Sequence, residues 1–175
     1  MDQPSITLIS FGYFEEEFLG QLAEAVRNEF PYPVRSREAY LDLSEFFDAG
    51  RRQYHGHKLL EAVKKMDQHD SFKVIGLFNV DLFIPILTFI FGQAQLGGRA
   101  GITSLYRLNN ERYGMPGNAN LLLERFKKEV IHELGHTFGL IHCHQPVCVM
   151  QSSTYVEDID QKEQHLCQDC HNRIK

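Results

Sequence analysis

Five residues between positions 132 and 142 have the types and the spacing of a metal-dependent hydrolase site. The segment HELGHTFGLIH fixes them in the order His132, Glu133, His136, Gly139 and His142. Residues four apart on a helix lie about one turn from each other, so His132 and His136 can bind one zinc ion from the same surface. Gly139 permits a sharp turn that ends the helix, and His142 can then return as the third ligand.

Glu133 lies beside the first histidine but cannot point at the same spot, which suits a general base. Its carboxylate can take a proton from a water molecule at the metal without occupying a coordination position. Three neutral imidazoles leave the charge of Zn²⁺ uncompensated and one position open for water, whose pKa can fall to about 7. A chance spacing of histidines is the alternative, and it is disfavoured because five positions in eleven agree.

Four cysteines near the C-terminus indicate a second metal site. Cys143 and Cys148 are followed by Cys167 and Cys170, and the later pair forms the compact turn CQDC, which is typical of tetrahedral zinc sites. Redox-active or free thiols are the alternative, but only five residues follow Cys170 and they contain no thioredoxin-like helix start. We therefore expect a Cys₄ zinc site.

The adjacency of His142 and Cys143 raises the question of whether one ion or two are bound. In an extended chain, neighbouring side chains point to opposite sides, so two separate sites are the simpler geometry. Four thiolates suppress the Lewis acidity of zinc, whereas three neutral histidines preserve it. We expect two zinc ions per chain, a catalytic one on the histidines and a structural one on the cysteines.

The composition bounds the class of protein. The 175 residues fit one domain with a real hydrophobic core, and a net charge of −5 argues against a general nucleic-acid or membrane-surface binder. No apolar segment is long enough to predict a transmembrane helix, and the N-terminus lacks the features of a secretory signal. We expect a cytoplasmic protein, in which cysteines are unlikely to form disulfides.

Strands alternate with helices in the predicted secondary structure. Apolar and β-branched runs predict strands at residues 5–11, 33–38, 72–83, 88–94 and 100–108, and helical periodicity predicts helices at 15–30, 51–66 and from about 119 to 138. This order predicts an α/β layer structure with a mixed sheet.

The last helix must position the histidines. Asn118 or Asn120 can cap it. An apolar stripe is expected to face the core, with the histidines on roughly the opposite side; the stripe contains Leu123, Phe126, Val130 and Leu134. Glu129 shares the histidine face, either as a partner of the site or as a solvated charge.

At this point the sequence resembles a known family. The histidine motif followed by Met150 resembles the metzincin metallopeptidases, in which a methionine turn lies beneath the catalytic zinc. The cysteine directly after His142, the segment CVM and the later cysteine pair resemble the archaemetzincins specifically. The segments RRQYHGHKLL, VDLFIPILTFIFGQA and GITSLYRL extend the resemblance over most of the chain.

The resemblance implies a zincin-like α/β (α+β) fold in one catalytic domain over residues 1–175. An upper subdomain, residues 1–139, would hold a twisted mixed sheet and the active-site helix. A small irregular lower subdomain, residues 140–175, would hold the structural zinc. The resemblance also implies that Met150 supports the catalytic zinc and that an edge strand near residues 88–94 pairs with an extended peptide.

The leading hypothesis is a zinc-dependent peptidase that acts on peptides or proteins, most simply as a monomer, with no nucleic-acid or membrane partner. A peptide-binding protein of the same fold with little hydrolysis is the alternative, although a pure binder has no need of Glu133. Nucleic-acid binding through the cysteine module is a third hypothesis, which the acidic composition opposes. Tyr155 is not expected to reach the zinc, and His144, His165 and His171 are expected to be exposed.

Overall fold

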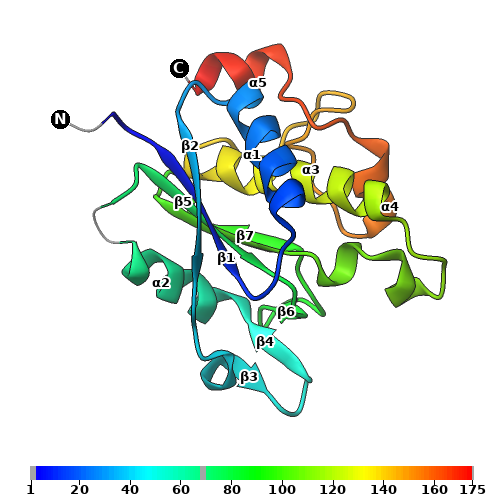
Figure 1. Ribbon diagram of the computed structural model, residues 1–175. Coiled ribbons are helices and arrows are strands. Elements are labelled where there is room, and N and C mark those ends of the chain that lie inside the picture. Colours follow the sequence, from blue (N-terminus) through cyan, green and yellow to red (C-terminus); the bar gives the residue numbers. More distant parts are fainter. Residues whose placement is uncertain (1–2, 68–69, 175) are drawn as a thin grey trace.

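A twisted five-stranded sheet forms the centre of the computed structural model, which describes residues 3–67 and 70–174 (Figure 1). The strand order is β2-β1-β5-β8-β7. The strands are β1 (Ile6–Phe11), β2 (Val34–Ala39), β5 (Lys73–Phe78), β7 (Gly92–Ala94) and β8 (Ala100–Ser104). All neighbours pair in parallel except β7, which is antiparallel to β8. The predicted mixed sheet is thus confirmed, while residues 1, 2, 68, 69 and 175 of the predicted domain lie outside the described residues.

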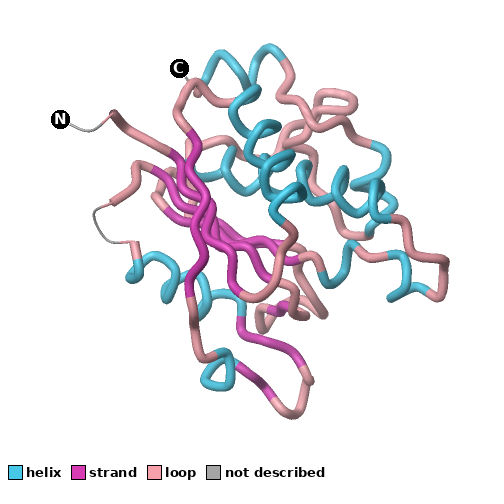
Figure 2. The backbone as a smooth tube through the Cα atoms, in the orientation of Figure 1, coloured by secondary structure: helices cyan, strands magenta, loops and turns pink. Residues whose placement is uncertain are grey.

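Helices cover both faces of this sheet (Figures 1 and 2). Helices α1 (Glu16–Glu29) and α3 (Ala119–Thr137) pack together on one face, and α2 (Gly56–Met66) lies on the other. Every residue of β1 and β5 is buried, which explains why both strands are apolar runs without alternation. Strand β7 ends the sheet beside α3.

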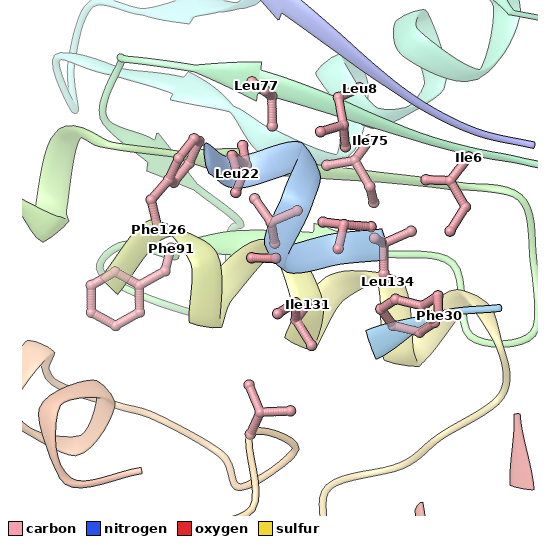
Figure 3. Close-up of a cluster of buried hydrophobic side chains, with 14 of the residues drawn as sticks. Ile6, Leu8, Leu22, Phe30, Ile75, Leu77, Phe91, Phe126, Ile131 and Leu134 are labelled. Carbon is pink, nitrogen blue, oxygen red and sulfur yellow. The ribbon is translucent and has the colours of Figure 1, made fainter. Parts of the chain in front are cut away.

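The apolar core fixes α3 against the sheet (Figure 3). Leu8 and Ile75 of the strands face Ile131 and Leu134 of α3, with Leu22 of α1 in the same cluster. All five side chains are at most 1 % exposed. Because close-packed interiors resist displacement, this contact gives the histidine helix a rigid base.

The region before α2 differs from the prediction. The helix begins at Gly56 and not at residue 51, because Arg52 adopts φ +56°, which a helix cannot accommodate. Residues 53–55 instead form a strand of a second, three-stranded sheet in the order β3-β4-β6. Its strands are β3 (Phe47–Asp48), β4 (Gln53–His55) and β6 (Leu82–Phe83), so the predicted strand at 72–83 is also split in two.

After Gly139 the chain is irregular, as expected. Its regular elements are the short helices α4 (Val156–Gln161) and α5 (Gln168–Arg173). Apolar residues from this part join the same core cluster as α1 and α3; they include Leu140, Val149, Met150, Val156, Ile159, Leu166 and Ile174. Among the described residues, no helix is both long and apolar enough to cross a membrane.

Candidate metal centres and active-site cleft

Helix α3 presents the first two histidines. Its N-terminus is capped by Asn118, whose side-chain oxygen accepts a hydrogen bond of 3.0 Å from the backbone N–H of Leu121. The predicted apolar stripe is buried along its whole length. The helix ends before Gly139, whose φ of +89° redirects the chain, and the N–H of Gly139 donates to the carbonyl of His136.

Three histidines meet at this turn. One ring nitrogen from each of His132, His136 and His142 lies within 4.8 Å of the other two. The Nε2 atoms of His132 and His136 are 3.0 Å apart. His132 is buried, His136 is half-buried and His142 is exposed, so the cluster opens to solvent on one side.

The hydrogen bonds of the first two histidines define their tautomers. Nδ1 of His132 lies 2.8 Å from the carbonyl of Val149, and Nδ1 of His136 lies 2.7 Å from the carbonyl of Leu140. A carbonyl can only accept, so each Nδ1 carries the proton and each Nε2 carries a lone pair. Burial lowers the pKa of both rings, for His132 well below its ordinary value, which disfavours a second proton.

Two lone pairs that face each other at 3.0 Å need a cation between them. Zinc–nitrogen bonds of about 2.0–2.1 Å in a tetrahedron separate the ligand atoms by about 3.3 Å, close to this spacing. The carbonyl acceptors also match the outer-shell bonds that orient metal-binding histidines. The residues present therefore fit a zinc ion.

Glu133 is buried beside this cluster, at 5 % exposure, and packs against Gly92 of β7. A Cβ atom on Gly92 would lie 2.9 Å from Cγ of Glu133 and 2.6 Å from the carbonyl oxygen of Ile102. Only glycine allows this approach. Burial raises the pKa of Glu133 well above its ordinary value, the Glu129 carboxylate adds to this effect, and the Lys162 ammonium opposes it.

Glu129 is not the solvated charge that was one of its two expected roles, because it is only 3 % exposed. Nζ of the buried Lys162 lies 3.3 Å from its Oε1 in an ion pair that falls short of hydrogen-bond geometry. Lys162 is missed by sequence reasoning, since it stands in the polar run DQKEQ, which resembles an exposed loop. No local signal could have identified it.

Met150 packs against α3 at Gly135. Its side chain is fully buried, and its Sδ is in such close contact with Gly135 that a Cβ atom there would collide with it. The carbonyl of Met150 accepts a hydrogen bond of 2.9 Å from the N–H of Cys143. The turn that carries Met150 thus contacts the histidine helix on one side and the cysteine segment on the other.

The histidines open into a cleft of about 440 Å³. Residues 87–94, including the edge strand β7, form one wall. A second wall is formed by residues 152–155, and Glu129 and Glu133 also line the cavity. Tyr155 is 63 % exposed and lies on this wall, so the structure brings it to the cleft, which its spacing did not predict.

The four cysteines form a second cluster. Their sulfur atoms all lie within 4.8 Å of one another, with Cys143 3.8 Å from Cys167 and Cys148 4.0 Å from Cys170. These distances exceed a disulfide bond of about 2.05 Å and match the separation of about 3.8 Å between thiolates on one tetrahedral zinc. Burial raises the pKa of the Cys148 and Cys170 thiols, so their ionised forms need a cation.

The two clusters share no residue, so each can bind a metal ion of its own. His144 is exposed beside them. Nδ1 of His165 lies 3.0 Å from the carboxylate of Glu29 on α1. His171 is half-buried on α5 rather than exposed.

Comparisons with known proteins agree with this geometry. The pattern of peptidase family M54 matches residues 13–175. An archaemetzincin of Pyrococcus horikoshii is 43 % identical over 141 residues, which are 77 % of this chain and 74 % of that protein.

Two solved structures share the fold. The crystal structure of an archaemetzincin from Methanopyrus kandleri superposes with a TM-score of 0.86 at 31 % identity and covers 98 % of this chain and 93 % of that one. A zinc-dependent peptidase from Methanocorpusculum labreanum gives a TM-score of 0.85 at 27 % identity over 98 % of this chain and all of that one, 100 %. The chain therefore belongs to peptidase family M54, the archaemetzincin family of zinc-dependent peptidases.

Proposed function

We propose that the chain hydrolyses peptide bonds with Glu133 as the general base, beside a zinc ion held by His132, His136 and His142. The proposal is carried by the two imidazole nitrogens that face each other without a proton, next to a buried carboxyl group. When bound, zinc supplies Lewis acidity toward a carbonyl oxygen and toward water. Glu133 takes a proton from the attacking water and passes it to the departing amine as the C–N bond breaks.

The substrate is an extended peptide that lies along β7. This strand ends the sheet, so its outer edge offers main-chain groups for pairing, and it lines the cleft beside Glu133. Tyr155 lines the same cleft. Gly139 and Met150 support the site by turning the chain and by packing against α3.

The cysteine cluster holds a second, structural zinc ion through Cys143, Cys148, Cys167 and Cys170. This assignment is supported by the sulfur spacing and by the two backbone N–H groups that donate to thiols, Gln145 to Cys143 and Cys167 to Cys148, each at 3.4 Å. Four thiolates complete a tetrahedron and leave no position for water. Two zinc ions per chain are expected in metal analysis.

We also infer one catalytic domain over residues 1–175, which acts as a monomer in the cytoplasm. The core shared by residues before and after Gly139 supports a single domain with two subdomains, 1–139 and 140–175. The unlinked cysteines support a reducing compartment. The net charge of −5 supports a protein without a nucleic-acid partner.

The variant Glu133→Gln tests the general base. It keeps the size of the side chain but cannot accept the proton, so we expect a loss of at least about 100-fold in the rate of peptide hydrolysis with both zinc ions retained. Glu124→Gln is the matched control, because Glu124 lies on the same helix with a side chain that is 49 % exposed. Hydrolysis by Glu133→Gln at the wild-type rate would remove Glu133 from this role.

The same assay separates the peptidase from a peptide-binding protein. Zinc-loaded wild-type chain is incubated with a peptide library, and both cleavage and retention are measured. A peptidase cleaves and Glu133→Gln only retains peptides, whereas a binding protein retains them equally in both forms and cleaves none.

A further inference from the structure

Lys162 is a buried lysine that contacts three parts of the active-site region. Its side chain is 0 % exposed. Its Nζ lies 3.3 Å from Oε1 of Glu129 on α3, 3.1 Å from the carbonyl of Gln151 and 3.4 Å from Nδ1 of His132. The ammonium therefore joins the histidine helix to the chain that follows Met150.

The contact with His132 is packing and not a hydrogen bond. Nδ1 of His132 already donates to the carbonyl of Val149, and an ammonium has no acceptor to offer it. What holds the ammonium in place is the carbonyl of Gln151, to which it donates, and the carboxylate of Glu129. Lys162 thus lies directly behind the ring of a metal ligand.

These contacts close a loop. Gln151 follows the methionine turn and Lys162 follows α4, so the bond between them joins the two ends of residues 151–162. The loop contains residues 152–155, which form a wall of the cleft. The His132–Val149 bond fixes the same chain two residues earlier. One ammonium therefore braces both a metal ligand and a wall of the substrate cleft.

The buried ion pair between Lys162 and Glu129 is poorly explained by a contribution to stability alone. Desolvation of two buried charges offsets most of their attraction, and neutral side chains of similar volume often serve a fold equally well. The described part of the chain gives Lys162 one carboxylate partner, Glu129, which is itself buried at 3 % exposure. The arrangement is better explained by what the ammonium can hold in place.

We propose that Lys162 is a positioning residue, which fixes the His132 ring and the cleft wall at residues 152–155 relative to α3. The inference rests on the proposed function only in treating this cleft as the substrate site. Loss of the ammonium then weakens zinc binding at the histidines and raises KM, while the cysteine site is unaffected.

The test compares three variants of the full-length chain: Lys162→Met, Glu129→Gln and the double variant. Each single variant leaves one buried charge unpaired, so its Tm falls by about 6–20 °C. The double variant removes both charges of this buried pair and recovers most of this Tm. It cannot donate to Gln151, however, so its histidine site binds zinc about 10- to 100-fold more weakly than wild type in chelator competition.

Lys128→Met is the matched control. Lys128 also joins α3 to the α4 region, since its Nζ donates to the carbonyl of Ile159 at 3.0 Å. Within the described part of the chain, its ammonium is not paired with Gln151 or with the carboxylate of Glu129. We expect wild-type zinc affinity for this variant. A double variant that regains both Tm and zinc affinity would show that the pair is merely structural and would overturn the proposal.

Peptide kinetics at saturating zinc give a second readout that remains useful if the double variant folds poorly. Displacement of the cleft wall raises KM in the folded fraction of Lys162→Met, whereas simple unfolding lowers kcat and leaves KM unchanged. An unchanged KM together with unchanged zinc affinity contradicts the proposal. The Tm and zinc measurements need no turnover, so they stay interpretable even if wild-type protein cleaves no peptide and the peptidase proposal fails.

Discussion

The histidine cluster and the cysteine cluster lie next to each other in the chain, yet they are built in opposite ways. His132 and His136 come from one helix that is packed on the sheet by a fully buried face. The paired cysteines are 24 and 22 residues apart in the chain. Cys143 and Cys148 lie in an irregular segment, whereas Cys167 is the N-cap residue of the short helix α5 and Cys170 lies on it. One long helix positions two of the three histidines, whereas the cysteines come from two segments that are far apart in the chain.

Their boundary falls between His142 and Cys143, so the third histidine belongs to the irregular region. It follows Gly139 in a segment without helix or strand and is exposed. The proposed catalytic site therefore takes two of its candidate ligands from α3 and one from the irregular segment that also contains Cys143. Its metal affinity should depend on both.

The largest expected effect follows from removing a cysteine. Cys167→Ser should lose the structural zinc and lower the Tm by about 8–16 °C, because an ion at 1,000 times its Kd contributes about 4 kcal/mol of stability. We also expect weaker zinc binding at the histidines, since His142 adjoins Cys143. Metal content, chelator competition and calorimetry measure these effects.

The matched control for this variant is Gln168→Ser, which alters the exposed neighbour of Cys167. It should retain both ions and the wild-type Tm. If Cys167→Ser lost one zinc but kept full affinity at the histidines and an unchanged Tm, the two clusters would be independent.

The same contrast governs what could be predicted from the sequence. The stripe of α3 and the spacing of its histidines are local features of a regular helix, so period and composition predict them. The cap was narrowed to Asn118 or Asn120, and the structure has it at Asn118. The cysteine cluster could be predicted because CQDC is itself a local motif. The strands β1 and β5 are equally clear as buried apolar runs.

Features made by contacts between distant residues could not be predicted. Lys162 and Glu129 are 33 positions apart, and only the irregular path after Gly139 brings them together. Tyr155 reaches the cleft for the same reason. The hairpin at β4 was missed because its residues continue the periodicity of α2, while the positive φ of Arg52 has no signal in composition.

A smaller effect is expected where Gly92 of β7 packs against Glu133, the proposed general base. Gly92→Ala places a methyl group against Glu133 and the carbonyl of Ile102, and the backbone can yield only if β7 moves from β8. We expect kcat/KM to fall by about 10- to 100-fold with zinc content unchanged, because a displacement near 1 Å can cost about 100-fold.

Gly20→Ala is the control for that variant. Gly20 lies on the exposed side of α1, where a Cβ atom meets nothing within 4 Å, so this substitution should leave kcat/KM unchanged and stabilise the fold by about 0.5–1 kcal/mol. If Gly92→Ala lost zinc, the substitution would have displaced the histidines and not only Glu133.

The smallest effect concerns strain in the irregular region. Val147 adopts φ +58°, which is unfavourable for a β-branched residue, and its side chain is 45 % exposed, so it contributes little burial. The turn persists because Cys148, the next residue, is buried in the cysteine cluster.

Val147→Gly should relieve about 1–2 kcal/mol of strain against a loss of about 0.5–1 kcal/mol in chain entropy. The net gain should raise the Tm by about 2–4 °C per kcal/mol. It should also strengthen zinc binding at the cysteines, since the binding free energy then no longer has to offset the strain of this turn. A lower Tm for Val147→Gly would mean that this turn is not strained and that the cysteine region is as well ordered by its own backbone as α3 is.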